Sequence, residues 1–237
     1  MKKVIKSEEY KGMYQYEYHR KDGSVTYSKP FHKNSGRKAE GENTKNIDME
    51  SNNVVNALKT MNYGGKVSDS MLEREFGIKP QDASKIGWDK YIESNRTPSG
   101  ERVWSITQKG REHLEQIEGQ KVYRYKSQTR DEYYKHDLKL SEEIASRINH
   151  GEVKEMYSEA QIRSMFENEM KRLEKEDYSR FEELNKMKLS PPDFVYKDQQ
   201  GNMVAIEVVS ENYTTAQIQA KMDFCSVMNF QYTSVAC

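Results

Sequence analysis

The sequence predicts a mixed α+β protein whose C-terminal end has α/β character, and three patterns support this. Tyrosines alternate with other residues near the N-terminus, which predicts a β-hairpin. Residues 51–119 combine helical spacing with one alternating segment, which predicts a helical domain that carries a hairpin. Residues 193–235 favour strand, turn, strand, helix and strand, which predicts a small mixed sheet. The predicted parts are residues 1–46, 47–126 and 127–237.

Composition narrows the functional classes. The 237 residues have zero net charge, but residues 1–126 carry 24 Lys and Arg against 18 Asp and Glu, and residues 127–237 carry 14 against 20. A net charge of +6 on the first half favours an acidic partner such as double-stranded DNA. The −6 of the second half suits metal chelation or a protein partner. The alternative is that the two halves differ in charge but are only soluble, so that the charge difference indicates no partner.

Targeting and redox features point to the cytoplasm. The start, "MKKVIKSEEY", has no apolar segment after its lysines, so it does not predict a secretory signal. No run of about 18 apolar residues occurs, so we expect no membrane partner. Cys225 and Cys237 form no CxxC pattern, which fits a reducing compartment.

The N-terminal hairpin is predicted from aromatic residues on both sides of "KDGS", an Asp-Gly turn signal. These residues are Tyr14, Tyr16, Tyr18, Val25, Tyr27 and Phe31. Residues 32–46 are almost devoid of apolar side chains and are expected to form a flexible, mildly basic loop.

In the central part, three predicted helices precede a hairpin and a fourth helix. Ser51 is the expected N-cap of the first helix, and Gly77 ends the second. The third covers about residues 80–91, "NRTPSG" is a turn, "ERVWSI" is a strand, and Thr107 caps the last helix, which Gly119 ends. This is the order of a winged helix-turn-helix. The stretch "RVWSITQKGREHL" resembles the closing strand and helix of many bacterial winged-helix regulators.

Residues on the inward faces of these elements should form the core of that domain. They are Val55, Leu58, Leu72, Ile86, Trp88 and Ile106. A winged helix would place the third helix in the major groove and the wing, at about residues 95–102, on the adjacent groove or backbone. The candidate DNA-binding residues are Gln81, Ser84, Lys85, Lys90, Asn95, Arg96 and Arg102. The alternative for each lysine is a solvated surface charge.

The third part begins with two predicted helical regions. A stripe of Tyr134, Leu138, Leu140, Ile144 and Ile148 predicts a helix, and "YSEAQIRSMFENEMKRLEKEDYSRFEELNKM" predicts a long polar helix or two. Strands are expected at 193–198, 203–209 and 229–235, with a helix at 214–227.

The stretch "PPDFVYKDQQGNMVAIEVV" resembles the PD-(D/E)xK nuclease superfamily. Asp193 follows Pro192 as the motif aspartate does, Glu207 matches the glutamate of the next strand, and Glu159 is placed like the helical glutamate. The resemblance implies that Asp193 and Glu207 bind Mg²⁺ and that a lysine orients water and stabilises charge at the phosphate. The motif lysine position holds Val209, and Lys221 on the following helix is the candidate replacement.

Two interpretations of these residues stay open. If the site is active, the catalytic set is Glu159, Asp193, Glu207 and Lys221 with Mg²⁺ as cofactor; otherwise we expect no cofactor. The plain structural alternative makes Asp193 a turn residue and Glu207 a charge at a strand edge. His136-Asp137 forms an HD pair, but the other histidines lack ligand-like spacing, which argues against a metal-dependent phosphohydrolase. No glycine-rich phosphate loop occurs.

The order of these motifs resembles replication-relaxation proteins of bacterial plasmids and integrative elements. It implies a DNA-binding accessory or regulatory protein of a plasmid, phage or other mobile element, with a nuclease-like domain that does not cleave. One alternative is an active Mg²⁺-dependent endonuclease. Another is a protein-interaction adaptor in which the winged helix binds a partner. We also expect that a homodimer or a protein partner would form through the C-terminal domain.

Overall fold

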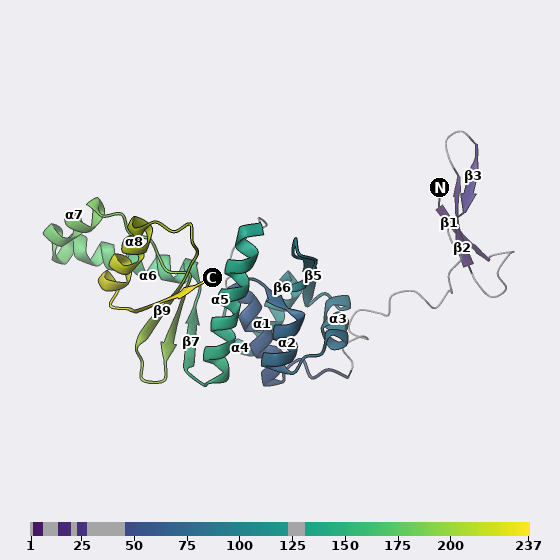
Figure 1. The fold of residues 1–237 in the computed structure, drawn as a ribbon, viewed down its shortest axis with the longest axis horizontal. Helices are drawn as coiled ribbons and strands as arrows, with labels where there is room; N and C mark the ends of the chain where they lie inside the picture. The colour runs from purple at the N-terminus through teal and green to yellow at the C-terminus, as the bar shows by residue number, and fades with distance from the viewer. Residues whose placement is uncertain (1, 7–13, 20–22, 28–45, 123–130) are drawn as a thin grey trace. The chain divides into compact units, whose positions relative to one another are not determined.

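The protein has a mixed α+β fold in two compact units, Met1–Glu42 and Asn43–Cys237 (Figure 1). The computed structural model describes residues 2–6, 14–19, 23–27, 46–122 and 131–237. The expected boundary at residue 126 and most of the expected loop at 32–46 lie outside these residues. Among the described helices, none combines the length and the hydropathy that crossing a lipid bilayer requires.

The N-terminal unit is a three-stranded antiparallel sheet. Its strands, in the spatial order β1-β2-β3, are β1 (Lys2–Lys6), β2 (Tyr14–His19) and β3 (Val25–Tyr27). The β2–β3 pair confirms the predicted hairpin, with Tyr18 opposite Thr26. Gly23 has a φ of +83°, which suits the turn because glycine adopts positive φ without steric cost. Strand β1 was not predicted, and Phe31 lies outside the described residues.

The second unit begins with a helical half. Its elements are α1 (Asn52–Gly64), β4 (Val67–Ser68), α2 (Asp69–Phe76), α3 (Pro80–Trp88), β5 (Ile92–Arg96), β6 (Arg102–Ile106) and α4 (Gln108–Glu118). Thr107 caps α4 by accepting a hydrogen bond from the Gly110 backbone N–H, and Gly119 ends the helix in the left-handed region, as predicted. Ser51 occupies the N-cap position of α1, but its hydroxyl donates to the Asp48 carbonyl instead of capping the helix.

Five of the six predicted core residues of this half are buried, and Trp88 is not. Trp88 is 66% exposed, whereas Ile86 is 2% exposed. The helical period explains the difference, because two positions turn the chain by about 200°. Trp104 on β6 fills the space instead, at 3% exposed. A Cβ on Gly87 would lie 2.8 Å from the Trp104 ring, so the small residue lets this ring pack against α3.

The C-terminal half contains a four-stranded mixed sheet with helices. Its elements are α5 (Asp131–Asn149), β7 (Val153–Tyr157), α6 (Glu159–Glu176), α7 (Tyr178–Lys186), β8 (Phe194–Asp198), β9 (Met203–Val209), α8 (Thr215–Val227) and β10 (Gln231–Ala236). The spatial order is β10-β9-β8-β7, with β10 parallel to β9 and the other pairs antiparallel. The last four elements match the prediction closely, whereas β7 was not predicted.

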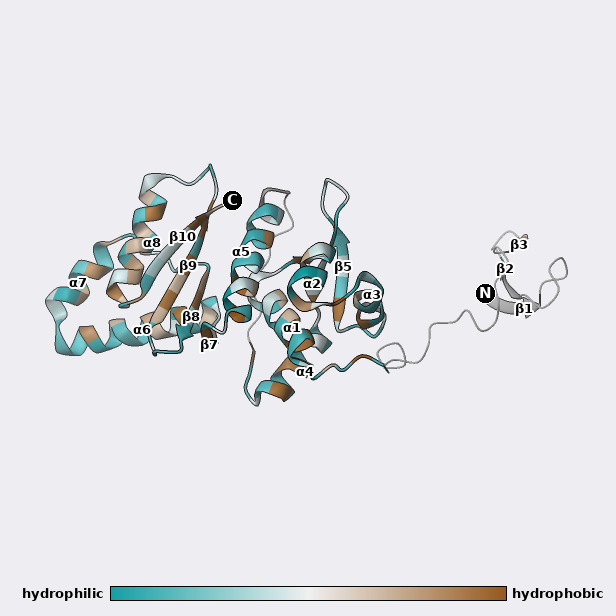
Figure 2. Ribbon diagram, turned by 60° about the horizontal axis from the view of Figure 1, so that its bottom comes forward, coloured by the Kyte–Doolittle hydropathy of each residue, from teal (hydrophilic) through white to brown (hydrophobic). Residues whose placement is uncertain are grey.

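Helices cover both faces of this sheet. On one face, Leu140 and Ile144 of α5 pack with Phe194 and Ile206. On the other, helices α6 and α8 supply Ile162 and Phe224, which pack with β8 and β9 (Figure 2). The alternation of side chains along a strand therefore sends successive residues of β9 toward α5 and toward α8.

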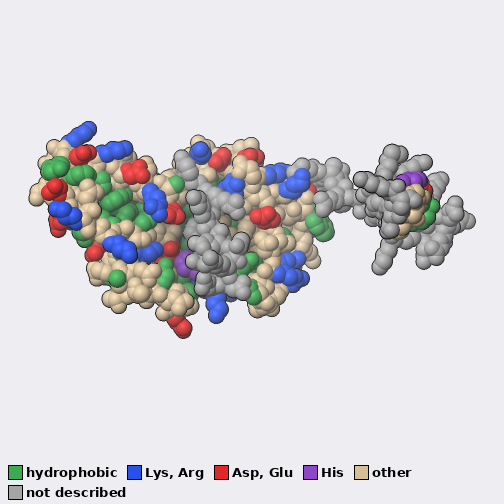
Figure 3. All heavy atoms as spheres, turned by 90° about the horizontal axis from the view of Figure 1, so that it is seen from above, with side chains coloured by type: hydrophobic (Ala, Val, Ile, Leu, Met, Phe, Trp, Pro, Cys, Tyr) green, Lys and Arg blue, Asp and Glu red, His purple; other side chains and the backbone are tan. Residues whose placement is uncertain are grey.

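The surface of α6 and α7 is polar. Arg172 pairs with Glu169 and Glu176, and Arg180 pairs with Glu183. Figure 3 shows basic and acidic side chains interspersed over this end of the molecule. Such exposed pairs contribute little to stability, because water and salt screen the charges.

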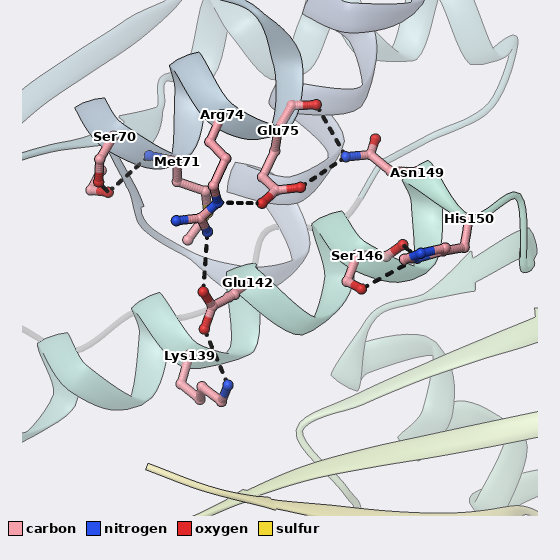
Figure 4. A network of polar contacts seen from close by, with 10 residues as sticks. Ser70, Met71, Arg74, Glu75, Lys139, Glu142, Ser146, Asn149 and His150 are labelled. Atoms are coloured by element: carbon pink, nitrogen blue, oxygen red, sulfur yellow. Dashed lines mark hydrogen bonds and ion pairs between the residues drawn. The ribbon is translucent and has the colours of Figure 1, made fainter.

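Helix α5 also packs against the helical half. A Cβ on Gly64 of α1 would lie 2.8 Å from the Ser141 Cα, so the two helices approach closely. Polar contacts join α5 to α2 as well: Arg74 pairs with Glu142 at 3.1 Å, and the Asn149 side chain donates to the Glu75 carbonyl at 3.0 Å (Figure 4). Helix α5 is thus shared by both halves of the unit.

Candidate functional site

Asp193 and Glu207 lie side by side where β8 begins. The pair Phe194–Ile206 belongs to the antiparallel ladder, so the next two positions, Asp193 and Glu207, face each other. The Asp193 backbone N–H donates to Glu207 Oε2 at 3.1 Å, and the Val208 N–H donates to Asp193 Oδ2 at 2.9 Å. The Glu207 side chain is fully buried. The two predicted metal-binding carboxylates therefore meet at one point.

Lys221 of α8 joins them. Its Nζ lies 2.5 Å from Glu207 Oε1 and 3.5 Å from Asp193 Oδ1, and it donates to the Pro191 carbonyl at 3.2 Å. The structure thus brings together three of the four residues proposed for catalysis. Val209, at the motif lysine position, ends β9 and accepts a backbone hydrogen bond from Cys237.

Glu159 does not join this group. It is the first residue of α6, its carboxylate pairs with Arg163 at 2.6 Å, and its side chain is 42% exposed. The physical reason is the place of α6, which begins directly after β7, the edge strand of the sheet. The helix that packs over the sheet next to Asp193 is α5, so the helical residue near the carboxylates comes from α5.

The sequence pointed to His136 only as part of an HD pair and did not predict its place at the carboxylates; it lies on α5. Its Nε2 is 3.0 Å from Asp193 Oδ2, and its side chain is 12% exposed. One signal in the sequence points to it, because His136, Leu140 and Ile144 are spaced by four residues and form one helical stripe. Leu140 and Ile144 pack on the sheet, so His136 extends the buried stripe by one turn to the carboxylates.

A buried ion pair adjoins His136. Lys66, between α1 and β4, lies 2.7 Å from Asp137 Oδ2, and both side chains are at most 5% exposed. The Lys66 ammonium also lies 4.6 Å from the centroid of the Tyr134 ring. Asp137 Oδ1 is 3.5 Å from His136 Nδ1. Basic and acidic side chains therefore form a continuous series of contacts from Lys66 in the helical half to Glu207.

The electrostatics of the site follow from burial and from these pairs. Burial raises the pKa of Glu207 to about 7, with a further contribution from the charge of Asp193 and an opposing one from Lys221. Burial alone would lower the pKa of His136, but the carboxylates of Asp137 and Asp193 outweigh it and raise this pKa to about 9. Burial opposes ionisation of Asp193, yet His136 and Lys221 lower its pKa.

The Lys221 ammonium occupies the position between the two carboxylates. Glu207 Oε1 and Asp193 Oδ1, the oxygens nearest to it, are the ones that a metal ion would use. Mg²⁺ binds through one or two carboxylates plus water and phosphate oxygens, so this donor set fits it. Bound there, the ion would supply positive charge at a phosphate and lower the pKa of a water molecule. Metal binding and the Lys221 contact compete for the same oxygens. Within the described ranges, no group of three or more His, Cys, Asp or Glu side chains could hold a metal ion.

The predicted DNA-binding residues lie on α3 and on the β5–β6 hairpin. Gln81 and Lys90 are exposed, and Lys85 pairs with Asp82 at 2.7 Å. Ser84 donates to the Pro80 carbonyl at 2.8 Å.

On the hairpin, Asn95 and Arg96 are exposed on the edge strand β5. The Arg96 guanidinium donates to the Gly100 carbonyl at 2.7 Å, within the hairpin loop. Arg102 pairs with Asp69 at 2.7 Å. Ser84, Lys85, Arg96 and Arg102 therefore have intramolecular partners. Of the two arginines, Arg96 is the exposed one.

In comparisons with protein-family models, curated proteins and solved structures, the chain has no match.

Proposed function

We propose that the chain binds double-stranded DNA through α3 and the β5–β6 hairpin, as a winged helix-turn-helix does. The observation that carries this proposal is the exposed face formed by both elements. Helix α3 buries Ala83 and Ile86 and leaves Gln81 and Trp88 exposed, and the edge strand β5 leaves Arg96 exposed beside the hairpin loop. A helix with one free face next to a two-stranded hairpin suits the major groove and the adjacent backbone.

In this proposal, the C-terminal half is a PD-(D/E)xK-like domain that contacts DNA or supports assembly and does not cleave. The support is the charge balance of the site. Its three acidic side chains, Asp137, Asp193 and Glu207, are matched by Lys66, His136 and Lys221. A site balanced in this way has no surplus negative charge with which to attract a divalent cation. The chain would then act as an accessory or regulatory protein of a mobile element.

Fluorescence anisotropy of a labelled duplex, measured over a series of NaCl concentrations, tests the DNA-binding part. We expect the affinity to fall with salt with a log–log slope of about −0.9 per neutralised phosphate. Arg96→Ala should weaken binding to every sequence and reduce the slope by about 1. Lys186→Ala is the matched control, because Lys186 is an exposed cation on α7, with a side chain that is 77% exposed. An affinity that does not depend on salt would refute the proposal.

An active endonuclease is the second candidate, and the position of Lys221 favours it. The Lys221 ammonium lies within 3.5 Å of both carboxylates, which supports a role for this lysine in place of the motif lysine, whose position holds Val209. Incubation of supercoiled plasmid with Mg²⁺ or Mn²⁺ decides between the two candidates. Cleavage that is lost in both Glu207→Ala and Lys221→Ala would establish the endonuclease. Intact plasmid with the wild type would support the non-cleaving domain.

A further inference from the structure

A cavity of about 740 Å³ opens in the helical half between α3, the β5–β6 hairpin and the start of α4. Both tryptophans of the chain, Trp88 and Trp104, line it. Its volume lies within the range of about 300–1,000 Å³ typical of small-ligand sites. Asp193, Glu207 and Lys221 do not line it, so the cavity is separate from the carboxylate site.

Trp88 is an exposed aromatic wall of this cavity. At 66%, its exposed fraction is the highest of any large hydrophobic side chain in the described part of the chain. Core packing does not explain why a tryptophan stands at position 88. Helix α3 buries its Ala83 and Ile86 face against the core, and Trp88 points away from that face. An indole at the wall of a cavity offers a flat face on which another planar ring can stack.

The rest of the cavity holds a fixed tryptophan and a fixed guanidinium. The Trp104 indole N–H donates to Asp69 Oδ1 at 2.7 Å, and the Arg102 Nε–H donates to Asp69 Oδ2 at 2.7 Å. The Arg102 guanidinium lies 5.0 Å from the centroid of the Trp104 ring. Because Arg102 is already held in place, it loses little conformational entropy when it meets an anion.

Cationic side chains also line the cavity. Arg102, Lys90 and Lys109 lie there beside Glu93 and Glu112, and Arg102 is paired with Asp69. The combination of a stacking wall and a basic rim suits a ligand that has a planar ring and a negative group. A nucleotide has both.

We propose that this cavity binds an unpaired base of DNA, stacked on Trp88, with its phosphate beside Arg102 and Lys109. The inference rests on the proposed function and names its substrate class, which is duplex DNA joined to a single-stranded segment. Bases inside a duplex present only their edges in the grooves, whereas an unpaired base presents its face. The duplex would lie on α3 and the hairpin, and the unpaired base would enter the adjoining cavity.

Anisotropy titrations with three labelled DNAs test the inference: a blunt duplex, the same duplex with a single-stranded tail, and the tail strand alone. We expect the wild type to bind the tailed duplex more tightly than the blunt one. Trp88→Leu should lower affinity for the tailed duplex by about 5- to 150-fold more than it lowers affinity for the blunt duplex, which is the range for loss of one stacked base. Trp88→Phe should keep most of the gain from the tail, because the phenyl ring still stacks.

Tyr178→Leu is the matched control, since Tyr178 is 60% exposed on α7, away from the cavity. A thermal melt of each variant confirms that it folds. If the tail adds no affinity, or if Trp88→Leu binds the tailed duplex as the wild type does, the inference is overturned. If the tail strand binds through Trp88 but the blunt duplex does not bind, the cavity binds an unpaired base as inferred, and the proposed duplex binding and the joined-duplex substrate class both fail.

Discussion

The stability of the protein should fall as the pH rises from about 6.5 to about 9, because of His136. Its pKa is about 9 in the folded protein, against an ordinary value of 6.5. The folded state therefore holds the proton more tightly than the unfolded state. The stabilisation is complete below the unfolded pKa and is lost as the pH passes the folded one. At about 1.4 kcal/mol per pKa unit, the loss is about 3 kcal/mol.

His136→Gln removes the titrating group and keeps a side chain that can donate a hydrogen bond to Asp193. Urea denaturation with a chelator present, at several pH values between 6 and 9.5, gives the free energy of unfolding of each variant. We expect the wild type to lose about 3 kcal/mol over this interval. The free energy of unfolding of His136→Gln should be lower than that of the wild type at pH 6 and should change little as the pH rises.

His150→Gln is the control for this experiment, because His150 is an exposed histidine on the turn after α5. It should retain the pH dependence of the wild type. The Glu207 titration belongs to lower pH, because its pKa is raised from 4.5 to about 7. The loss of stability that it causes develops as the pH rises between those values and stays constant above them. If the free energy of unfolding falls equally steeply with pH above pH 7 in the wild type and in His136→Gln, the reasoning is refuted.

Three further predictions test the packing. Trp88→Ala should change the free energy of unfolding by less than about 0.5 kcal/mol, whereas Trp104→Ala should cost about 3–5 kcal/mol; equal effects in thermal melts would contradict the burial of these rings. Lys66→Met should cost about 3–5 kcal/mol, because it removes the ammonium that pairs with the buried Asp137 carboxylate. Adding Asp137→Leu should restore most of the loss in urea denaturation. Gly64→Ala should cost about 1–3 kcal/mol in the same assay, because a Cβ there would lie 2.8 Å from the α5 backbone; a more stable variant would show that the helices separate easily.

Local signals allowed much of the fold to be predicted. Thr107 and Gly119 mark the ends of α4 because caps act within one turn, and the alternation over β9 is regular. Strand β7 was missed because its pairing with β8 shifts register between Val153 and Glu155, which interrupts the period of two. Trp88 was misplaced because a large aromatic residue was assigned to the core without regard to its angle from Ile86.

Part of the candidate site was also predictable from local signals in the sequence. Asp193 and Glu207 belong to adjacent strands joined by a short turn, so their spacing alone brings them together. Lys221 follows on the next helix, α8. Whether its ammonium contacts the two carboxylates depends on the direction in which α8 runs across the sheet, and the sequence does not fix that direction. His136 is 57 residues from Asp193, and no local pattern fixes a contact over that separation. Only the packing of α5 on the sheet does so.

The contact between Lys221 and the carboxylates decides what the site needs in order to cleave. A metal ion would have to displace an ammonium that has three oxygen partners, Glu207, Asp193 and the Pro191 carbonyl. The displaced ammonium would then need new partners in a site where its side chain is only 11% exposed. The centroid of the Tyr213 ring lies 5.9 Å from it. Loss of these contacts by a buried charge costs several kcal/mol, which metal binding must offset. A phosphate beside Lys221 would reduce that cost, because it gives the ammonium a new partner. Metal binding should therefore be weak without DNA, and calorimetric titration of Mg²⁺ in the absence and presence of DNA would reveal this difference.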